Sequence, residues 1–228
     1  MSSPSRNQRC PCGSGRKFKH CCGDPAVMRK PGTRHNGPIA LPGGRLVSVS
    51  GAIHAALQLQ QNGRLPEAAA VCDLVLRNDP ANADALHLKG LTARLLGDHD
   101  TAVALIQRAI EVNPTIAIFH NNLAEVFLSL NRFNKAIEKC RTAIQLQPDL
   151  PEAHFNLGRA LRGQGRLDEA MSCFERVISQ RPDFADAHGA LGWTLTNAGK
   201  GGRVSRAPGA GGRAQSSLGR GAHQHPWQ

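Results

Sequence analysis

A repeat of 34 residues occupies the middle of this 228-residue chain and restricts its fold more than any other feature. Residues 49–82, 83–116, 117–150 and 151–184 align without a gap, and places are counted from the first residue of each. All four segments have alanine at place twenty, proline at place thirty-two, and alanine or glycine at place eight. A period of this length is typical of small structural units stacked along one direction.

The regular spacing of small residues and helix breakers predicts two antiparallel helices in each repeat. Small residues at places eight and twenty allow two helix backbones to approach closely. Place fifteen is Gly63, Gly97, Asn131 or Gly165, residue types that tolerate the left-handed conformation found where a helix ends. The proline at place thirty-two ends the second helix and begins the turn to the next repeat. Because one hairpin cannot bury its apolar face alone, the sequence predicts an all-α solenoid of stacked hairpins.

This pattern resembles the tetratricopeptide repeat, most closely in residues 151–184, which read PEAHFNLGRALRGQGRLDEAMSCFERVISQRPDF. The resemblance implies a right-handed solenoid over residues 49–200 and a concave groove that holds a protein or peptide partner. Residues 185–200 contain only the first helix of a fifth repeat, with Gly199 at place fifteen, where that helix is expected to end. We expect it to pack on the fourth repeat as a cap.

Two repeats also resemble those in the superhelix of O-GlcNAc transferase, through the segments AIFHNNLA and PEAHFNLG. In that subtype an asparagine at place six grips extended peptide backbone. Asn122 and Asn156 match it, whereas His54, Leu88 and Ala190 do not, so the resemblance implies a ladder of two asparagines. An amide suits this role because it both donates and accepts hydrogen bonds.

Three charged residues complete the candidate groove. The family's geometry places Glu125, Arg159 and Arg162 on the same inner surface as the two asparagines. Two arginines one helical turn apart could clamp a carboxylate of the partner. The alternative is that all five are ordinary polar positions on the solvated side of amphipathic helices.

Four cysteines near the amino terminus form a separate motif, CPCGSGRKFKHCCG, over residues 10–23. Thiolates of Cys10, Cys12, Cys21 and Cys22 would give the closed tetrahedral shell of a structural zinc ion, and disulfides or free thiols are the alternatives. The motif resembles SEC-C, known from the carboxyl terminus of the SecA translocase, which implies a zinc knuckle over residues 1–23. A closed shell has no open position, so catalytic zinc is not expected.

The positive charge of the chain is concentrated at its two ends. The formal net charge is +11, of which residues 1–48 carry +8, residues 49–184 carry −1 and residues 185–228 carry +4. Residues 24–48 contain four prolines and are predicted to be a flexible linker. Residues 201–228 are rich in Gly, Arg and Ala without an apolar period, which predicts a disordered tail, and the abrupt loss of register suggests a reading-frame shift.

Several functional classes are disfavoured by what the chain lacks. It has no apolar run long enough to span a membrane and no secretion signal, which together with seven cysteines favours a cytoplasmic protein. No phosphate-binding glycine loop and no nucleophile with a base can be identified, so we expect a protein that is not an enzyme.

Three functions remain, in decreasing order of expectation. The first is a scaffold that binds a protein or peptide in the concave groove, with the zinc knuckle as a second contact. The second is the substrate-recruiting front of a truncated transferase, a sulfotransferase or an O-GlcNAc-transferase-like enzyme. The third, expected least, is binding of nucleic acid or an anionic surface through the basic ends, which would weaken steeply with salt.

Overall fold

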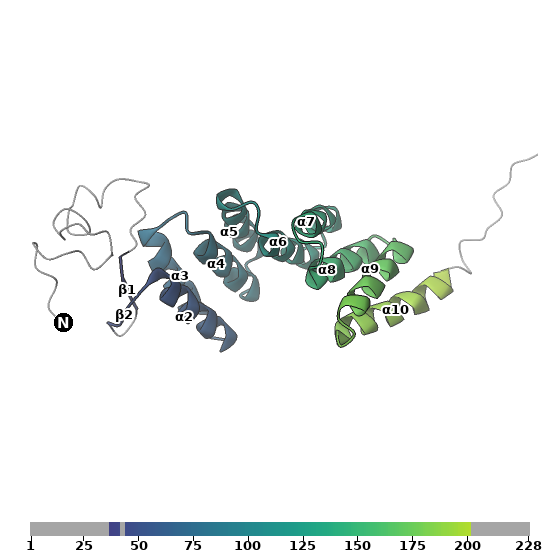
Figure 1. Ribbon diagram of the computed structural model, residues 1–228, viewed down its shortest axis with the longest axis horizontal. Coiled ribbons are helices and arrows are strands. Elements are labelled where there is room, and N and C mark those ends of the chain that lie inside the picture. Colours follow the sequence, from purple (N-terminus) through teal and green to yellow (C-terminus); the bar gives the residue numbers. More distant parts are fainter. Residues whose placement is uncertain (1–36, 42–43, 202–228) are drawn as a thin grey trace, which may run out of the picture.

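Four antiparallel helical hairpins and one further helix follow one another along an elongated array (Figure 1). The computed structural model describes residues 37–41 and 44–201, so the predicted zinc knuckle and tail lie outside the described residues. The first helices are α2 (Val49–Gln61), α4 (Ala83–Leu95), α6 (Ala117–Ser129) and α8 (Pro151–Gly163). The second helices are α3 (Leu65–Asn78), α5 (His99–Val112), α7 (Phe133–Leu146) and α9 (Leu167–Gln180), and α10 (Ala185–Gly201) follows. The predicted all-α solenoid is confirmed.

The turn inside each hairpin is formed by the residue at place fifteen. Gly63, Gly97, Asn131 and Gly165 have φ angles of 74°, 84°, 54° and 77°, in the left-handed region, as predicted. The backbone N–H of the following residue donates to the carbonyl at place eleven in all four repeats, for example Arg166 to Leu161 at 3.0 Å. This closure satisfies a carbonyl that the end of the helix would otherwise leave unpaired.

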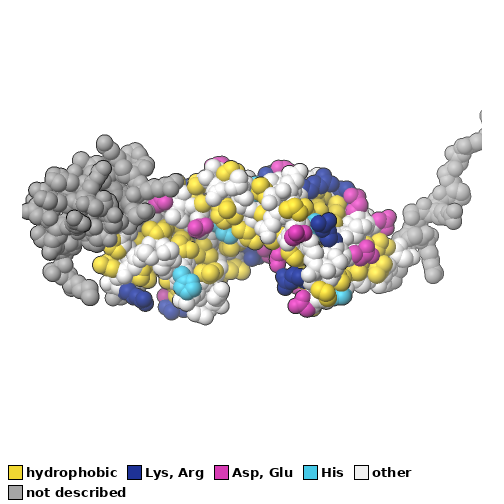
Figure 2. Space-filling view, in the orientation of Figure 1, with side chains coloured by type: hydrophobic (Ala, Val, Ile, Leu, Met, Phe, Trp, Pro, Cys, Tyr) yellow, Lys and Arg dark blue, Asp and Glu magenta, His cyan; other side chains and the backbone are white. Residues whose placement is uncertain are grey.

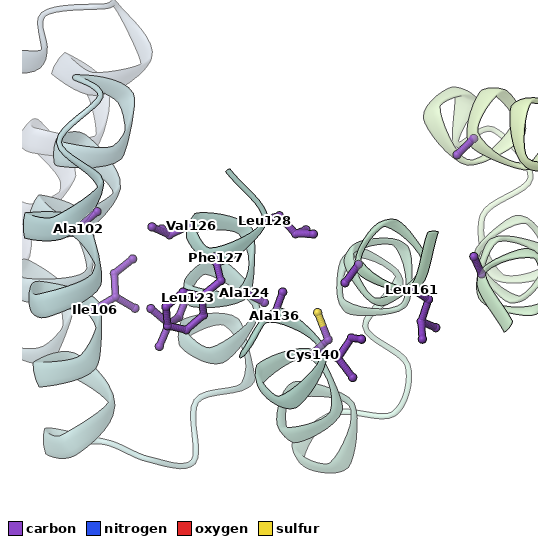
Figure 3. Packing of buried hydrophobic residues seen from close by; sticks show 14 of the residues in the cluster. Ala102, Ile106, Leu123, Ala124, Val126, Phe127, Leu128, Ala136, Cys140 and Leu161 are labelled. Atoms are coloured by element: carbon purple, nitrogen blue, oxygen red, sulfur yellow. The ribbon is translucent and has the colours of Figure 1, made fainter. Parts of the chain in front are cut away.

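The two helices of a hairpin meet at the small residue of place eight. A Cβ atom added to Gly90 would lie 2.6 Å from Cγ1 of Ile106, and one added to Gly158 would lie 2.6 Å from Cε1 of Phe174. Ile106 and Phe174 both occupy place twenty-four, so each glycine receives a side chain from the second helix of its own repeat. Figure 3 shows Ile106 of α5 directed toward Leu123 of α6, in the buried cluster that joins the second and third repeats.

Cysteines fill place twenty-four in the other two repeats. Cys72 and Cys140 are fully buried and serve as small core residues. Burial raises the pKa of each thiol to about 12, so both stay protonated at neutral pH.

A histidine at place four fastens each of the last three first helices to the turn before it. The ring Nε2 donates to the carbonyl of the proline at place thirty-two of the preceding repeat, because a carbonyl oxygen can only accept. The pairs are His120 with Pro114 at 2.9 Å, His154 with Pro148 at 2.9 Å and His188 with Pro182 at 2.8 Å. The sequence analysis did not identify these bonds between repeats.

A small hairpin closes the amino-terminal end of the array, where the sequence analysis predicted only a linker. Strand β1 (Ile39–Ala40) pairs antiparallel with β2 (Leu46–Val47), through a turn in which Gly44 has φ 79°. Ile39 is 2% exposed and packs in the core of the first repeat. The prediction of a flexible linker over residues 24–48 is therefore wrong for this part, because the apolar side chains of the hairpin cover the first repeat.

Helix α10 ends the described array differently from the other first helices. It packs on α9, which confirms the predicted cap. It does not turn at Gly199, however, and continues to Gly201 over 17 residues. In the other repeats the chain folds back at place fifteen because a second helix then packs on the first. Within the described residues no such helix follows α10, and the helix runs on.

Candidate functional site

The inner face of the array is formed by the first helix of each repeat. First helices of successive repeats contact one another, as α6 and α8 do, whereas second helices of successive repeats make no contacts of comparable extent in the described part. The array therefore curves with the first helices inside. On the face of the molecule seen in Figure 2, charged side chains gather over the later repeats, and hydrophobic side chains are more prominent over the earlier ones.

A chain of hydrogen bonds, the polar ladder, crosses the inner face from the fourth repeat to the second. Its members, from last to first, are Arg159, Asn156, Asn121, Asn122 and His87. Arg159 Nη1 donates to Asn156 Oδ1 at 3.2 Å, and Asn156 Nδ2 donates to Asn121 Oδ1 at 3.0 Å. Asn121 Nδ2 then donates to Asn122 Oδ1 at 3.2 Å, and Asn122 Nδ2 lies 2.9 Å from His87 Nε2. Every amide thus accepts from the ladder member nearer Arg159 and donates to the member nearer His87.

The ladder ends on a histidine that must be neutral. Because Asn122 donates to His87 Nε2, that nitrogen must carry a lone pair rather than a proton. The His87 ring also stacks on Phe119, with ring centroids 4.5 Å apart. Burial lowers the pKa of His87 to about 4, so the neutral ring is the stable form at neutral pH.

Both predicted ladder asparagines are hydrogen-bonded to other side chains of the inner face. Asn156 is only 5% exposed, and its amide both accepts from Arg159 and donates to Asn121. Asn122 is half-buried. The structure thus brings both residues to the inner face, as the resemblance implied, and uses their amides to join repeats and to hold Arg159.

Glu125, also predicted for the groove, is paired within the protein. Its Oε1 lies 3.3 Å from Nη1 of Arg94, at place twelve of the preceding repeat. This pair is partly buried and neutralises both charges on this part of the inner face. Glu125 therefore brings no net negative charge to a ligand there.

The two predicted arginines carry charge without a counterion. In the part of the chain that the structure describes, neither Arg159 nor Arg162 has a carboxylate oxygen within 4.0 Å. Burial, and then the charge of Arg159, lower the pKa of Arg162, yet a guanidinium remains charged at neutral pH. Two neighbouring and partly buried cations of this kind favour an anionic ligand.

Aromatic rings hold both guanidinium groups in place. Arg159 lies over Phe155 at 5.9 Å, and Arg162 lies over Trp193 at 4.9 Å and Phe174 at 6.0 Å, each measured to the ring centroid. Trp193 belongs to α10 and is 55% exposed beside Arg162. We call Arg159, Arg162 and Trp193 the arginine–tryptophan site.

Three residues of the inner face were missed by the sequence analysis, and their register could have revealed them. His87 and Asn121 both stand at place five, directly before place six, where the asparagine ladder was predicted. Trp193 stands at place nine, as Glu125 and Arg159 do in the two preceding repeats.

The first repeat offers a different surface. A hollow of about 590 Å³ lies where α2 approaches the start of α4. It is lined by Ser48, Val49, Ser50, Ile53, His54, Leu57, Asn82 and Asp84. More of its exposed wall is apolar than polar, and Asp84 is the carboxylate in its lining, so this part of the inner face differs from the later part, where two arginines suit an anion.

Among the described residues, no three His, Cys, Asp or Glu side chains are grouped so that they could hold a metal ion. The predicted zinc ligands Cys10, Cys12, Cys21 and Cys22 lie outside the described residues. The same described part contains no helix with the length and apolarity to cross a membrane.

Comparison with known proteins identifies both sequence patterns. The tetratricopeptide repeat family matches residues 87–151 and 127–194. The chain carries tetratricopeptide repeats. The SEC-C motif matches residues 6–24, and SecA from a Nitratiruptor species is 75% identical over 20 residues. That match covers 9% of this chain and 2% of the SecA chain, so the chain spans a very small part of that relative.

Solved structures resemble the array as a whole. A crystal structure of MamA has a TM-score of 0.58 at 24% identity, covering 63% of this chain and 84% of MamA. YrrB, described as a TPR protein with an unusual peptide-binding site, has a TM-score of 0.54 at 27% identity, covering 65% of this chain and 76% of YrrB. These likenesses agree with a tetratricopeptide solenoid. The resemblance to O-GlcNAc transferase stays a prediction.

Proposed function

We propose that this protein is a scaffold whose inner face binds an extended, carboxylate-bearing segment of a protein partner. The observation that carries the proposal is the pair Arg159 and Arg162, which the fold leaves partly buried without a counterion in the described part. Keeping two guanidinium groups close together is unfavourable unless an anion joins them. A carboxylate can accept two parallel hydrogen bonds from a guanidinium, which gives orientation as well as affinity.

The surroundings of the pair support a peptide rather than a free ion. Asn156 fixes Arg159 at its Nη1, and the exposed ring of Trp193 offers an apolar surface beside Arg162. Asn122, half-buried in the ladder, lies on the path toward the apolar hollow of the first repeat. The peptide-binding site named for YrrB, which is 27% identical, supports the same use of this fold.

The test is selection from a displayed library of random twelve-residue peptides, followed by titration of the enriched peptides. We expect enriched peptides to contain Asp, Glu or a free carboxyl terminus. The double variant Arg159→Ala, Arg162→Ala should bind them at least ~10-fold more weakly, since two charge-assisted contacts are lost.

Arg176→Ala is the matched control, because Arg176 is exposed on the second helix α9. It should leave the affinity unchanged. Enriched peptides that lack carboxylates, or that bind the double variant as well as the parent protein, would remove the arginine–tryptophan site from the proposal.

We also propose that Cys10, Cys12, Cys21 and Cys22 bind one structural zinc ion in a cytoplasmic protein. The match to the SEC-C motif and the four thiolate-forming side chains support it. Elemental analysis of the full chain should give one zinc per chain, and Cys10→Ser with Cys12→Ser should abolish it. Cys173→Ser should retain the metal, since Cys173 belongs to the array. Zinc retained after loss of Cys10 and Cys12 would contradict the assignment.

A further inference from the structure

The outer side of α10 exposes places four, eight and eleven, which are buried in α4, α6 and α8. We call His188, Gly192, Leu195 and Gly199 the terminal face; they stand at places four, eight, eleven and fifteen. Leu195 is 53% exposed, whereas Ala93, Phe127 and Leu161, at the same place, are at most 8% exposed. In the earlier repeats, the second helix of the same hairpin covers this place.

Gly192 of the terminal face forms a socket that no side chain fills in the described structure. Gly90 and Gly158, at the same place, receive Ile106 and Phe174. A Cβ atom added to Gly192 would meet nothing within 4 Å. The terminal face therefore pairs a glycine that has open space above it with an exposed leucine one turn further along the same helix.

The spacing of the terminal face reads the same in both directions. Its four residues are separated by steps of four, three and four. If two copies of α10 cross antiparallel about a twofold axis, Leu195 of each copy meets Gly192 of the other. His188 then meets Gly199. Each large side chain thus faces a glycine, which is the self-complementarity that a twofold contact requires.

The charge of α10 also fits contact with a second copy. From Ala187 to Gly199 the helix contains no Asp, Glu, Lys or Arg. In a twofold contact each residue near the axis lies close to its own copy, so a charge there would meet a like charge. A neutral stripe with small residues avoids this repulsion and allows a close approach.

The opposite end of the array cannot serve as the partner surface. Ile39 of β1 already packs in the core of the first repeat, and the hairpin β1–β2 covers it (Figure 1). Stacking of one array on the head of another is therefore blocked. Contact between two terminal faces remains.

We propose that two copies of this chain associate tail to tail through the terminal face, with Leu195 of each copy seated on Gly192 of the other. The proposal is independent of the peptide groove, because Arg159, Arg162 and Trp193 lie at other places of the repeat. It assigns the terminal face to a second copy rather than to residues 202–228 or to another protein.

The first test is the mass of the full chain in solution, by light scattering over about 1–100 µM protein with reductant and zinc present. We expect twice the 24.4 kDa chain mass at the upper concentrations. Leu195→Lys and Gly192→Glu should each raise the dissociation constant at least ~30-fold, because each buries an unpaired charge. A chain that stays monomeric at 100 µM would overturn the proposal, and this includes the case in which residues 202–228 cover the face.

Leu96→Glu is the matched control, because Leu96 is 54% exposed at the end of α4, away from the terminal face. It should dimerise like the parent chain, and circular dichroism should show all variants folded. Persistence of the dimer in both α10 variants would place the contact elsewhere and overturn the proposal.

The sharpest test mixes the Gly192→Glu and Leu195→Lys variants. In the mixed pair, the introduced glutamate of one chain meets the introduced lysine of the other, and the second contact keeps the native leucine on glycine. Each variant alone should be monomeric, and the mixture should form a one-to-one dimer within ~10-fold of the parent affinity. Failure of the mixture to associate would overturn the antiparallel register.

Discussion

The two ends of this array solve the same problem differently. Each repeat needs a neighbour on both sides, because one hairpin cannot cover its own apolar surface. At the amino-terminal end the short hairpin β1–β2 supplies that cover and buries Ile39. At the other end α10 covers α9 but leaves Leu195 and the Gly192 socket open. An identical repeat unit thus gives one closed end and one end suited to association.

The largest expected effect is a difference in the free energy of unfolding between substitutions at the two ends. Ile39→Ala should lower the free energy of unfolding by about 3 kcal/mol, because it removes a fully buried side chain from the first repeat. Leu195→Ala should lower it by less than about 1 kcal/mol, since more than half of that side chain is exposed. Urea unfolding, at a concentration where the chain is monomeric, measures both. Equal losses would show that the hairpin does not close the array.

Acid should destabilise the interior of the array through His87. The pKa of His87 is about 4 in the folded protein and 6.5 in an unfolded chain. Between these values the unfolded state binds a proton that the folded state does not, so stability falls as pH falls from 6.5 toward 4. At pH 5 the loss relative to pH 7 should be about 2 kcal/mol.

Two variants measure how much of the pH dependence of stability comes from His87. In His87→Gln the side-chain oxygen can still accept from Asn122 but does not titrate, so the loss between pH 7 and pH 5 should shrink by about 2 kcal/mol. Gly192→Ala, at the open end, adds no titrating group and should keep the parent's pH dependence. The same slope in parent and His87→Gln would contradict a neutral His87 at the end of the polar ladder.

The smallest effect compares two glycines at the same place. Gly158→Ala should destabilise by about 1 kcal/mol, because the clash with Phe174 outweighs the better helix propensity of alanine. Gly192→Ala should stabilise the monomer by about 0.5–1 kcal/mol, because its added Cβ meets nothing. Thermal unfolding at low protein concentration measures the difference in sign. A loss at both positions would mean that the Gly192 socket is already filled.

The repeat period predicted the helices of the array well. Place fifteen predicted each turn because glycine and asparagine adopt the required φ at low cost, and the small residue at place eight predicted where the two helices approach closely. The sequence did not predict the conformation of a segment where that conformation depends on contacts with a neighbouring repeat rather than on the segment's own pattern. Two-residue strands such as Ile39–Ala40 are too short to show an alternation, so only burial against the first repeat reveals them.

The candidate site was predicted in position more than in role. The family resemblance predicted five residues for the inner face, but several of the contacts that these residues make belong to other repeats. Asn156 is hydrogen-bonded to Asn121, and Glu125 is paired with Arg94, each in the preceding repeat. A pattern read within one repeat does not show such contacts. Similarly, α10 passes Gly199 because the second helix that would turn the chain back does not follow in the described part.

The hairpin β1–β2 also limits how far the SEC-C motif can lie from the array. The SEC-C match ends at residue 24 and β1 begins at Ile39, so the fourteen residues 25–38 tether the motif to the closed end. Such a segment can extend to about 50 Å at most. A molecule bound by the motif is therefore held within about that distance of the closed end.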